Sequence, residues 1–153
     1  MPKPIPDDYP RVIASLTVRG AADAIDFYTE IFGGRLHSDP MTAPDGTVAH
    51  AEIRIGDSMI MLGEESPVFD SHAPQEDAAA PVRLMVYVED ADETVRRAVE
   101  RGARQESELR TEFYGDRGAA IRDPFGHAWY VASHVEDVSP EEIDRRAHEL
   151  FTT

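Results

Sequence analysis

The chain has 153 residues, 41% of them hydrophobic, which suits one globular domain rather than a disordered segment. Its formal net charge of −15 opposes binding to nucleic acid or to an anionic membrane. There is no cysteine, so disulfides, thiolate zinc sites and cysteine nucleophiles are excluded. No apolar run approaches the length of a membrane span, and the first residues lack the apolar core of a signal peptide. We therefore expect a cytoplasmic protein.

Residues 11–63 are expected to form a first module. Apolar residues alternate over 11–18, which predicts a half-buried strand. Apolar residues at helical spacing over 21–32 predict an amphipathic helix, which ends at the glycine pair 33–34. The rest of the module is expected to contain a short strand over 35–38, a turn over 43–46, and a hairpin of strands 48–55 and 58–62 around Gly56.

Residues 64–81 are rich in proline, alanine and acidic residues, and we interpret them as a linker. A second module is expected over 82–135. Its predicted elements are a strand over 82–88, a helix over 90–101, a strand over 103–110, a loop over 114–117 and a closing hairpin over 119–134. A capping box at 139–142 predicts a final helix to residue 151, whose apolar face docks onto the domain or onto a partner subunit.

The two halves of the chain repeat one pattern. Gly126, in the turn of the closing hairpin, and Gly56, in the turn of the first hairpin, are 126 − 56 = 70 residues apart. The same offset relates Val18 to Val88, and each of these residues closes an apolar run that precedes a helical pattern. Internal repetition is a strong guide to fold, so we expect one strand–helix–hairpin unit to occur twice.

This double unit, with Asp-Pro-Phe-Gly before its last strand, resembles the vicinal-oxygen-chelate superfamily of glyoxalase I, bleomycin-resistance proteins and extradiol dioxygenases. The segments that resemble its PhnB-like branch are Leu16–Ala22, Ile25–Tyr28, His50–Ser58, Tyr114–Arg117, Arg122–Trp129 and the tail 134–142. The resemblance implies an α+β fold within one domain, 1–153. Two βαβββ modules would form curved sheets around a cup, with a C-terminal helix added, and we expect a homodimer.

The resemblance also implies where a metal would bind. Members that use a metal place His and Glu at four equivalent positions, which here hold Ile13, Arg83, Tyr130 and Ile60, or Met61 if the register shifts by one. None of these side chains is a normal ligand of a divalent metal. We therefore expect no metal and no cofactor.

Arg83 is the strongest candidate for a binding residue, because a guanidinium in an apolar strand needs an anionic partner. Two interpretations are open: a bound anionic ligand, or an internal ion pair with Glu52 or Asp116. Tyr130 can donate its hydroxyl to a ligand or to the backbone of the core.

The other candidates are four polar residues. His50 and Glu52 lie on one face of a strand and can contact a ligand, contribute to a displaced metal site, or form an ordinary hydrogen-bonded pair. Tyr114 and Arg117 lie in a predicted loop that closes one end of the cup or packs against it.

The leading functional hypothesis is binding of a small organic molecule in the cup without a metal. The main alternative is a lyase, isomerase or dioxygenase, with an unusual metal site or with His50 and Glu52 as acid and base. A methyltransferase activity finds no support, because no segment resembles a nucleotide-cofactor site.

Overall fold

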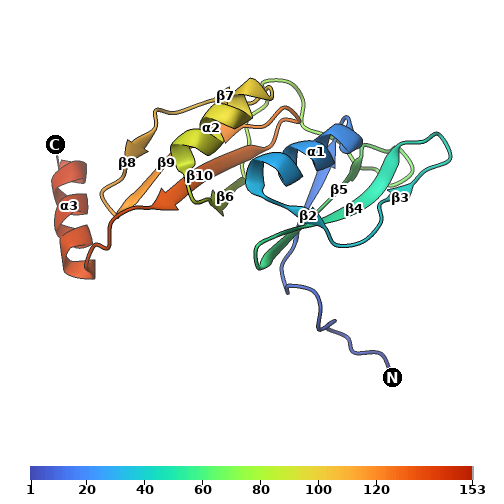
Figure 1. The fold of residues 1–153 in the computed structure, drawn as a ribbon, viewed down its shortest axis with the longest axis horizontal. Helices are drawn as coiled ribbons and strands as arrows, with labels where there is room; N and C mark the ends of the chain where they lie inside the picture. Colours follow the sequence, from blue (N-terminus) through green and yellow to red (C-terminus); the bar gives the residue numbers. More distant parts are fainter. Residues whose placement is uncertain (153) are drawn as a thin grey trace. The chain divides into compact units, whose positions relative to one another are not determined.

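In a computed structural model, which describes residues 1–152, the chain forms two compact units. The first contains Met1–Ala79 together with Pro124–His127, and the second contains Ala80–Asp123 together with the chain from residue 128 onward. Each unit holds one five-stranded mixed sheet with a helix packed on it (Figure 1). The expected pair of βαβββ modules is therefore confirmed, although the first unit also includes a turn from far along the chain.

The first unit has the sheet order β1-β5-β4-β2, with β3 paired to β4. Strands β1 and β5 run parallel, and β4 is antiparallel to β5. The elements are β1 (Ala14–Val18), α1 (Ala21–Phe32), β2 (Arg35–Leu36), β3 (Met41–Thr42), β4 (Val48–Ile55) and β5 (Ser58–Glu64). Strand β3 was not predicted from the sequence, whereas the bounds of α1 and β4 match the prediction.

Helix α1 is closed at both ends by glycine. Gly20 at its start has a φ of 90° and no capping side chain, and Gly33 at its end has a φ of 69°. The missing cap is supplied by β5, because the carboxylate of Glu64 accepts hydrogen bonds from the backbone N–H groups of Gly20 (2.9 Å) and Ala21 (2.8 Å). A negative charge at this position also favours the helix dipole. Glu64 therefore fixes where α1 begins on the sheet.

The two faces of the first sheet differ in what covers them. Ala51, Ile53 and Leu62 lie on the face under α1 and are at most 1% exposed. The opposite face, which we call the open face of the first sheet, carries Glu52 and its cross-strand partner Met61. Of the two alternatives for the family's metal position, Met61 is therefore correct and Ile60 faces the helix.

The shift from Ile60 to Met61 follows from the lengths of the two hairpin turns. Two residues separate the paired Ile55 and Ser58, whereas five separate the paired Arg122 and Ala128. Strands that follow the turns are consequently offset by 130 − 61 = 69 residues rather than the 70 that the glycines suggest.

The second unit has the order β6-β10-β9-β7, with β8 paired to β9. Helix α2 packs on this sheet, and Asp90 caps it by accepting a hydrogen bond from the N–H of Glu93 at 3.0 Å. The elements are β6 (Arg83–Tyr87), α2 (Ala91–Glu100), β7 (Arg104–Gln105), β8 (Arg110–Thr111), β9 (Asp116–Arg122), β10 (Ala128–His134) and α3 (Pro140–Thr152).

Two expectations for the second module need correction. The predicted strand 103–110 is broken into β7 and β8, because the hydroxyl of Ser107 accepts the hydrogen bond from the N–H of Ala120 that a backbone carbonyl would otherwise accept. The predicted loop 114–117 is shorter, since β9 already begins at Asp116.

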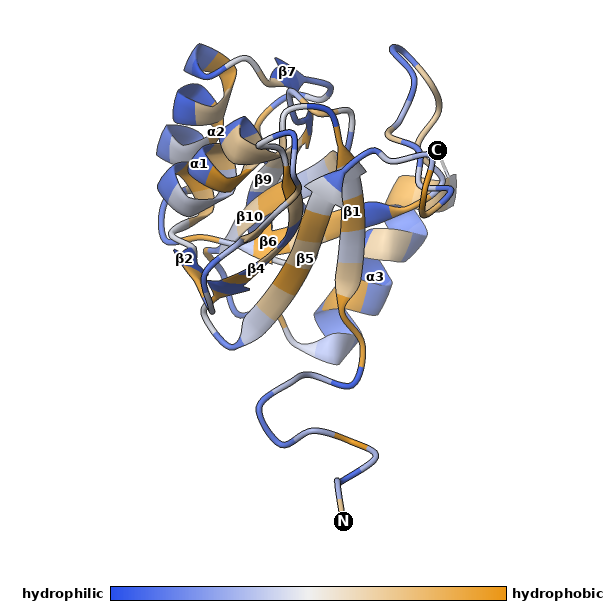
Figure 2. Cartoon of the chain, turned by 90° about the vertical axis from the view of Figure 1, so that its right-hand side faces the viewer, coloured by the Kyte–Doolittle hydropathy of each residue, from blue (hydrophilic) through white to orange (hydrophobic). Residues whose placement is uncertain are grey.

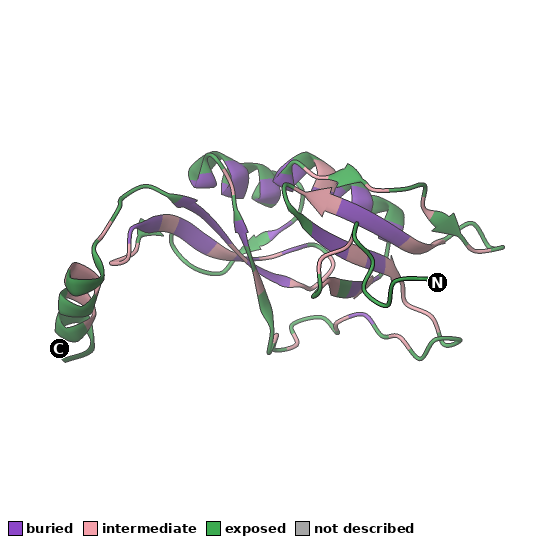
Figure 3. Ribbon diagram, turned by 90° about the horizontal axis from the view of Figure 1, so that it is seen from below, coloured by how far each residue is buried: buried purple, intermediate pink, exposed green. Residues whose placement is uncertain are grey.

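The faces of the second sheet follow the alternation of its strands. Trp129, Val131 and Ile121 lie on the α2 side and are at most 2% exposed (Figure 3). The opposite face, the open face of the second sheet, carries Arg83 and Tyr130, which the pairing of β6 with β10 places on the same side. The expectation that Trp129 belongs to the helix-facing core is confirmed.

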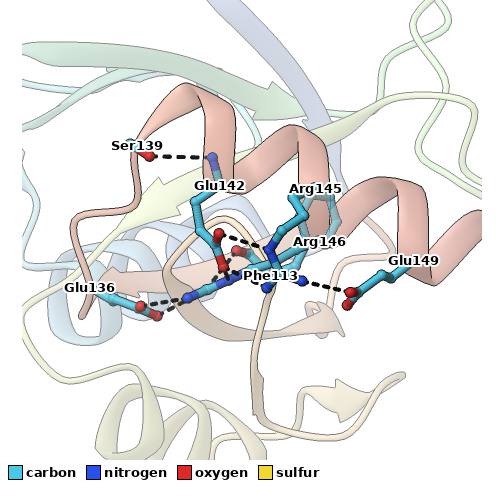
Figure 4. A network of polar contacts seen from close by, with 7 residues as sticks. All are labelled: Phe113, Glu136, Ser139, Glu142, Arg145, Arg146 and Glu149. Atoms are coloured by element: carbon cyan, nitrogen blue, oxygen red, sulfur yellow. Dashed lines mark hydrogen bonds and ion pairs between the residues drawn. The ribbon is translucent and has the colours of Figure 1, made fainter.

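Helix α3 is held by polar contacts rather than by burial. None of its described residues is buried (Figure 3), although hydrophobic and hydrophilic residues alternate along it (Figure 2). The guanidinium of Arg146 donates to the carbonyl of Phe113 at 3.1 Å and to Glu136 at 3.0 Å (Figure 4). The rings of Phe113 and Phe151 meet edge to face at 6.4 Å. No helix among residues 1–152 is both long enough and apolar enough to cross a membrane.

Candidate functional site

Arg83 lies exposed near the start of β6, on the open face of the second sheet. Its guanidinium carbon is 5.4 Å from the centre of the Tyr130 ring, which is the geometry of a cation–π contact. Among residues 1–152 it forms no ion pair, because the carboxylate of Asp116 is bonded to Tyr87 and His134 instead. An arginine held over an aromatic ring without a carboxylate is prepared to bind an anion.

Tyr130 occupies the middle of the same face, directly opposite Met85. Its hydroxyl is buried and has no hydrogen-bond partner among the described residues. Burial, followed by the electrostatic influence of the neighbouring Tyr114, raises the pKa of Tyr130 to about 12. The hydroxyl therefore stays protonated at neutral pH, where it can donate a hydrogen bond to a ligand that reaches it.

A cluster of three polar residues marks the other end of this open face. Asp116 is 3% exposed; it accepts hydrogen bonds from the hydroxyl of Tyr87 at 2.7 Å and from Nδ1 of His134 at 2.9 Å. The bond with Asp116, and then that between Nε2 and Asp137, raises the pKa of His134. The hydrogen bond to Asp116 likewise raises the pKa of Tyr87. The buried carboxylate thus organises a donor-rich end of the sheet.

Sequence reasoning missed this cluster, although one signal for it was present. Residues Arg83, Met85 and Tyr87 alternate along β6 and share one face, so Tyr87 follows from the position of Arg83. The contributions of Asp116 and His134 depend on the pairing of β9 with β10, which the sequence does not specify residue by residue.

Tyr114 and Arg117 lie in the second unit with Arg83 but have different surroundings. Tyr114 contacts the ring of Phe113 edge to face at 5.2 Å and influences Tyr130, so it borders the candidate site. Arg117 belongs to β9 and binds Asp92 of α2 with two hydrogen bonds of 2.7 and 2.8 Å. That bidentate pair turns its guanidinium toward the helix and away from the open face.

His50 and Glu52 lie together on the open face of the first sheet. Nε2 of His50 is 3.1 Å from one oxygen of Glu52, and the hydroxyl of Tyr9 donates to the other at 2.8 Å. Burial acts to raise the pKa of Glu52, but the hydrogen bonds from His50 and then Tyr9 outweigh it, so the pKa lies below its usual value. Glu52 is therefore a charged, fully engaged hydrogen-bond acceptor.

The residues at the family's four metal positions do not fit a metal. Ile13, Met61, Arg83 and Tyr130 offer neither imidazole nor carboxylate, and a guanidinium repels a cation. Across the described residues 1–152, no three His, Asp or Glu side chains are grouped in a way that could hold a metal ion.

Comparisons with known proteins agree with this architecture. The family model of the Glyoxalase/Bleomycin resistance protein/Dioxygenase superfamily matches residues 12–131. The uncharacterized protein Mb0911c from Mycobacterium bovis is 34% identical over 137 residues, which cover 88% of this chain and 90% of that protein.

Two solved structures share the fold. TioX from Micromonospora sp. ML1 has a TM-score of 0.62 and 25% identity, with 82% of this chain and 99% of that one covered. The PhnB protein from Bacillus cereus has a TM-score of 0.60 and 18% identity, with 81% and 99% covered.

Proposed function

Because the chain belongs to the Glyoxalase/Bleomycin resistance protein/Dioxygenase superfamily, we propose that it binds a small organic molecule on the open face of its second sheet. The ligand carries an anionic group for Arg83 and an apolar body for Met85 and the ring of Tyr130. The observation that carries the proposal is the guanidinium of Arg83, which stacks on Tyr130 and has no carboxylate partner within residues 1–152. The proposal includes binding without the family's metal and a place in the PhnB-like branch.

The strand geometry gives this site a direction. Arg83 and Tyr87 are four residues apart on β6, so their side chains are separated by about 13 Å along the strand. Between them lie Met85, which is 48% exposed, and the buried hydroxyl of Tyr130. An amphiphilic ligand along β6 would place its anion at Arg83, its apolar part on Met85 and an acceptor at Tyr130.

The enzymatic alternative that uses His50 and Glu52 gains little support. A general base needs a free lone pair and a pKa near the working pH. Both oxygens of Glu52 accept hydrogen bonds, and its pKa is lowered. These properties suit a structural or ligand-contacting carboxylate better than a base.

The test compares naphthalene-2-carboxylate with its neutral carboxamide in NMR titrations of the protein and of Arg83→Met. We expect the carboxylate to shift amide signals of β6 and β10, and Arg83→Met to weaken its binding about tenfold while leaving the carboxamide unchanged. Because Arg83 has no internal partner, we expect the free energy of unfolding to change by no more than about 0.5 kcal/mol.

Arg96→Met is the matched control, since it removes the same charge from α2, where Arg96 binds Glu93 and Glu100. Equal weakening by both variants would reduce the effect to net charge and contradict the proposal. A sharp loss of stability in Arg83→Met with unchanged carboxylate binding would show that the arginine is structural.

A further inference from the structure

A second concave surface lies in the first unit, formed by the turn that joins β3 to β4 and the chain that leaves β5. It encloses about 510 Å³, within the range of small-molecule pockets. Pro44 lies on one wall, and Pro67, Val68 and Phe69 lie on the other. The strands that carry these segments can be followed in Figure 1.

The charged groups of this pocket all have one sign. Its lining includes the carboxylates of Asp45, Glu64 and Glu65 and no lysine, arginine or histidine. Glu64 is occupied by the start of α1, and one oxygen of Glu65 binds Arg19 at 3.0 Å. The potential inside the pocket is therefore negative, in agreement with the net charge of −15.

Two carboxylate oxygens here have unused hydrogen-bonding capacity. Thr47 donates twice to Oδ1 of Asp45, at 3.0 and 2.7 Å, and these bonds lower the pKa of Asp45 so that it is charged at neutral pH. Within residues 1–152, Oδ2 of Asp45 and Oε1 of Glu65 accept no hydrogen bond. An ionised oxygen beside an apolar wall is suited to a cationic donor.

The apolar wall is unusually open to solvent. Val68 is 83% exposed and Phe69 is 76% exposed, although both are large hydrophobic residues. Adjacent exposed hydrophobic residues mark a surface that binding covers. The face of an aromatic ring also attracts a cation, so Phe69 complements the carboxylates.

We propose that this pocket binds an organic cation, in which a flat apolar body contacts Phe69 and a positive group donates hydrogen bonds to Asp45 and Glu65. The site is separate from the one at Arg83 and has the opposite charge preference. Each can therefore fail without the other.

The experiment uses three ligands that share a naphthalene ring: the 2-carboxamidinium, the 2-carboxamide and the 2-carboxylate. Each is titrated into the protein while backbone amide signals are followed by NMR. We expect the carboxamidinium to give saturable shifts confined to residues 43–49 and 64–69. Asp45→Asn and Phe69→Ala should each weaken its binding by about three- to tenfold, since partly exposed charge and cation–π contacts are modest.

Two variants serve as matched controls. Asp57→Asn removes one negative charge from the turn between β4 and β5, and Phe151→Ala removes an aromatic ring that is 77% exposed on α3. Neither should change binding. The proposal is overturned if no saturable shifts occur, if the carboxylate binds the same residues equally well, or if Asp57→Asn weakens binding as much as Asp45→Asn.

A loss of folding in Asp45→Asn would appear as collapsed dispersion of the amide spectrum. In that case Glu65→Gln supplies the test of charge. An unchanged affinity in both Glu65→Gln and Phe69→Ala overturns the proposal.

Discussion

The two tyrosines of the second sheet's open face have hydroxyl groups in opposite situations. The hydroxyl of Tyr87 donates to the buried carboxylate of Asp116 at 2.7 Å, whereas the hydroxyl of Tyr130 is buried without a partner. A satisfied hydrogen bond to a charged group stabilises the fold, and an unsatisfied buried hydroxyl destabilises it. The same chemical change should therefore have opposite effects at the two positions.

We expect Tyr130→Phe to raise the free energy of unfolding by about 1 kcal/mol, because it removes a polar group that burial penalises. For a chain of this size that corresponds to a melting temperature higher by about 2–4 °C. The same variant should weaken binding of naphthalene-2-carboxylate if the hydroxyl donates to the ligand. Thermal denaturation and the NMR titration measure the two effects separately.

Tyr87→Phe is the matched comparison and should lower the melting temperature, because it leaves an acceptor oxygen of Asp116 without its donor. A lower melting temperature for both variants would mean that the hydroxyl of Tyr130 is satisfied in solution, and it would remove that group from the proposed site.

At this scale the sequence predicted positions better than interactions. Alternation along 82–88 correctly placed Arg83 on the face opposite the helix, because a strand has a fixed period of two. Whether Arg83 has a carboxylate partner depends on which donors reach Asp116 first, and Tyr87 and His134 come from two other positions of the folded sheet. Such competition is a tertiary property.

The elements were predictable where backbone signals and packing agree. The bounds of α1 follow from its apolar stripe and its flanking glycines. Strands β7 and β8 were not, because a side chain, Ser107, takes over the hydrogen bond of a backbone group between them. Helix α3 was predicted from its capping box, but its mode of attachment was not.

Two neighbouring arginines of α3 differ in what they connect. Arg146 joins the helix to Phe113 and Glu136, whereas Arg145 binds Glu142 and Glu149 of the same helix (Figure 4). We expect Arg146→Met to increase hydrogen exchange across residues 140–152 without changing exchange in β9 and β10. Its effect on global stability should stay below about 1 kcal/mol, because exposed ion pairs contribute little.

Arg145→Met is the matched control and should leave the attachment of α3 intact, since its partners lie on the helix itself. Equal exchange in the two variants would show that Arg146 does not hold the helix in place.

For the whole molecule, we propose a homodimer in which a second copy covers the apolar end of α3. Leu150 is 54% exposed and Phe151 is 77% exposed, and no residue of the helix among those described is buried. Each sheet also ends in an unpaired edge strand, β1 in one and β6 in the other. Both features are typical of surfaces that pair with another chain.

Light scattering at micromolar concentration should give twice the 17.0 kDa of one chain. Replacing both Leu150 and Phe151 with Asp should shift the mass toward a single chain, because charge is costly in an apolar interface. Val99→Asp, at a residue that is 43% exposed on α2, should leave the mass unchanged. A mass of one chain for the unaltered protein would contradict the dimer.

The turn at residues 124–127 has a consequence for how the chain is made. Phe125 packs against Phe27 and Tyr28 with ring centres 6.1 Å apart in each case, and Nε2 of His127 donates to the carbonyl of Thr17 at 2.9 Å. On the ribosome, the first unit would therefore wait for a segment synthesised 127 − 79 = 48 residues after its main body. At roughly 5–20 residues per second, that interval lasts about 2–10 s. During it, the aromatic residues of α1 lack their last neighbour, so an incomplete nascent chain would offer chaperones a hydrophobic surface that the finished protein hides.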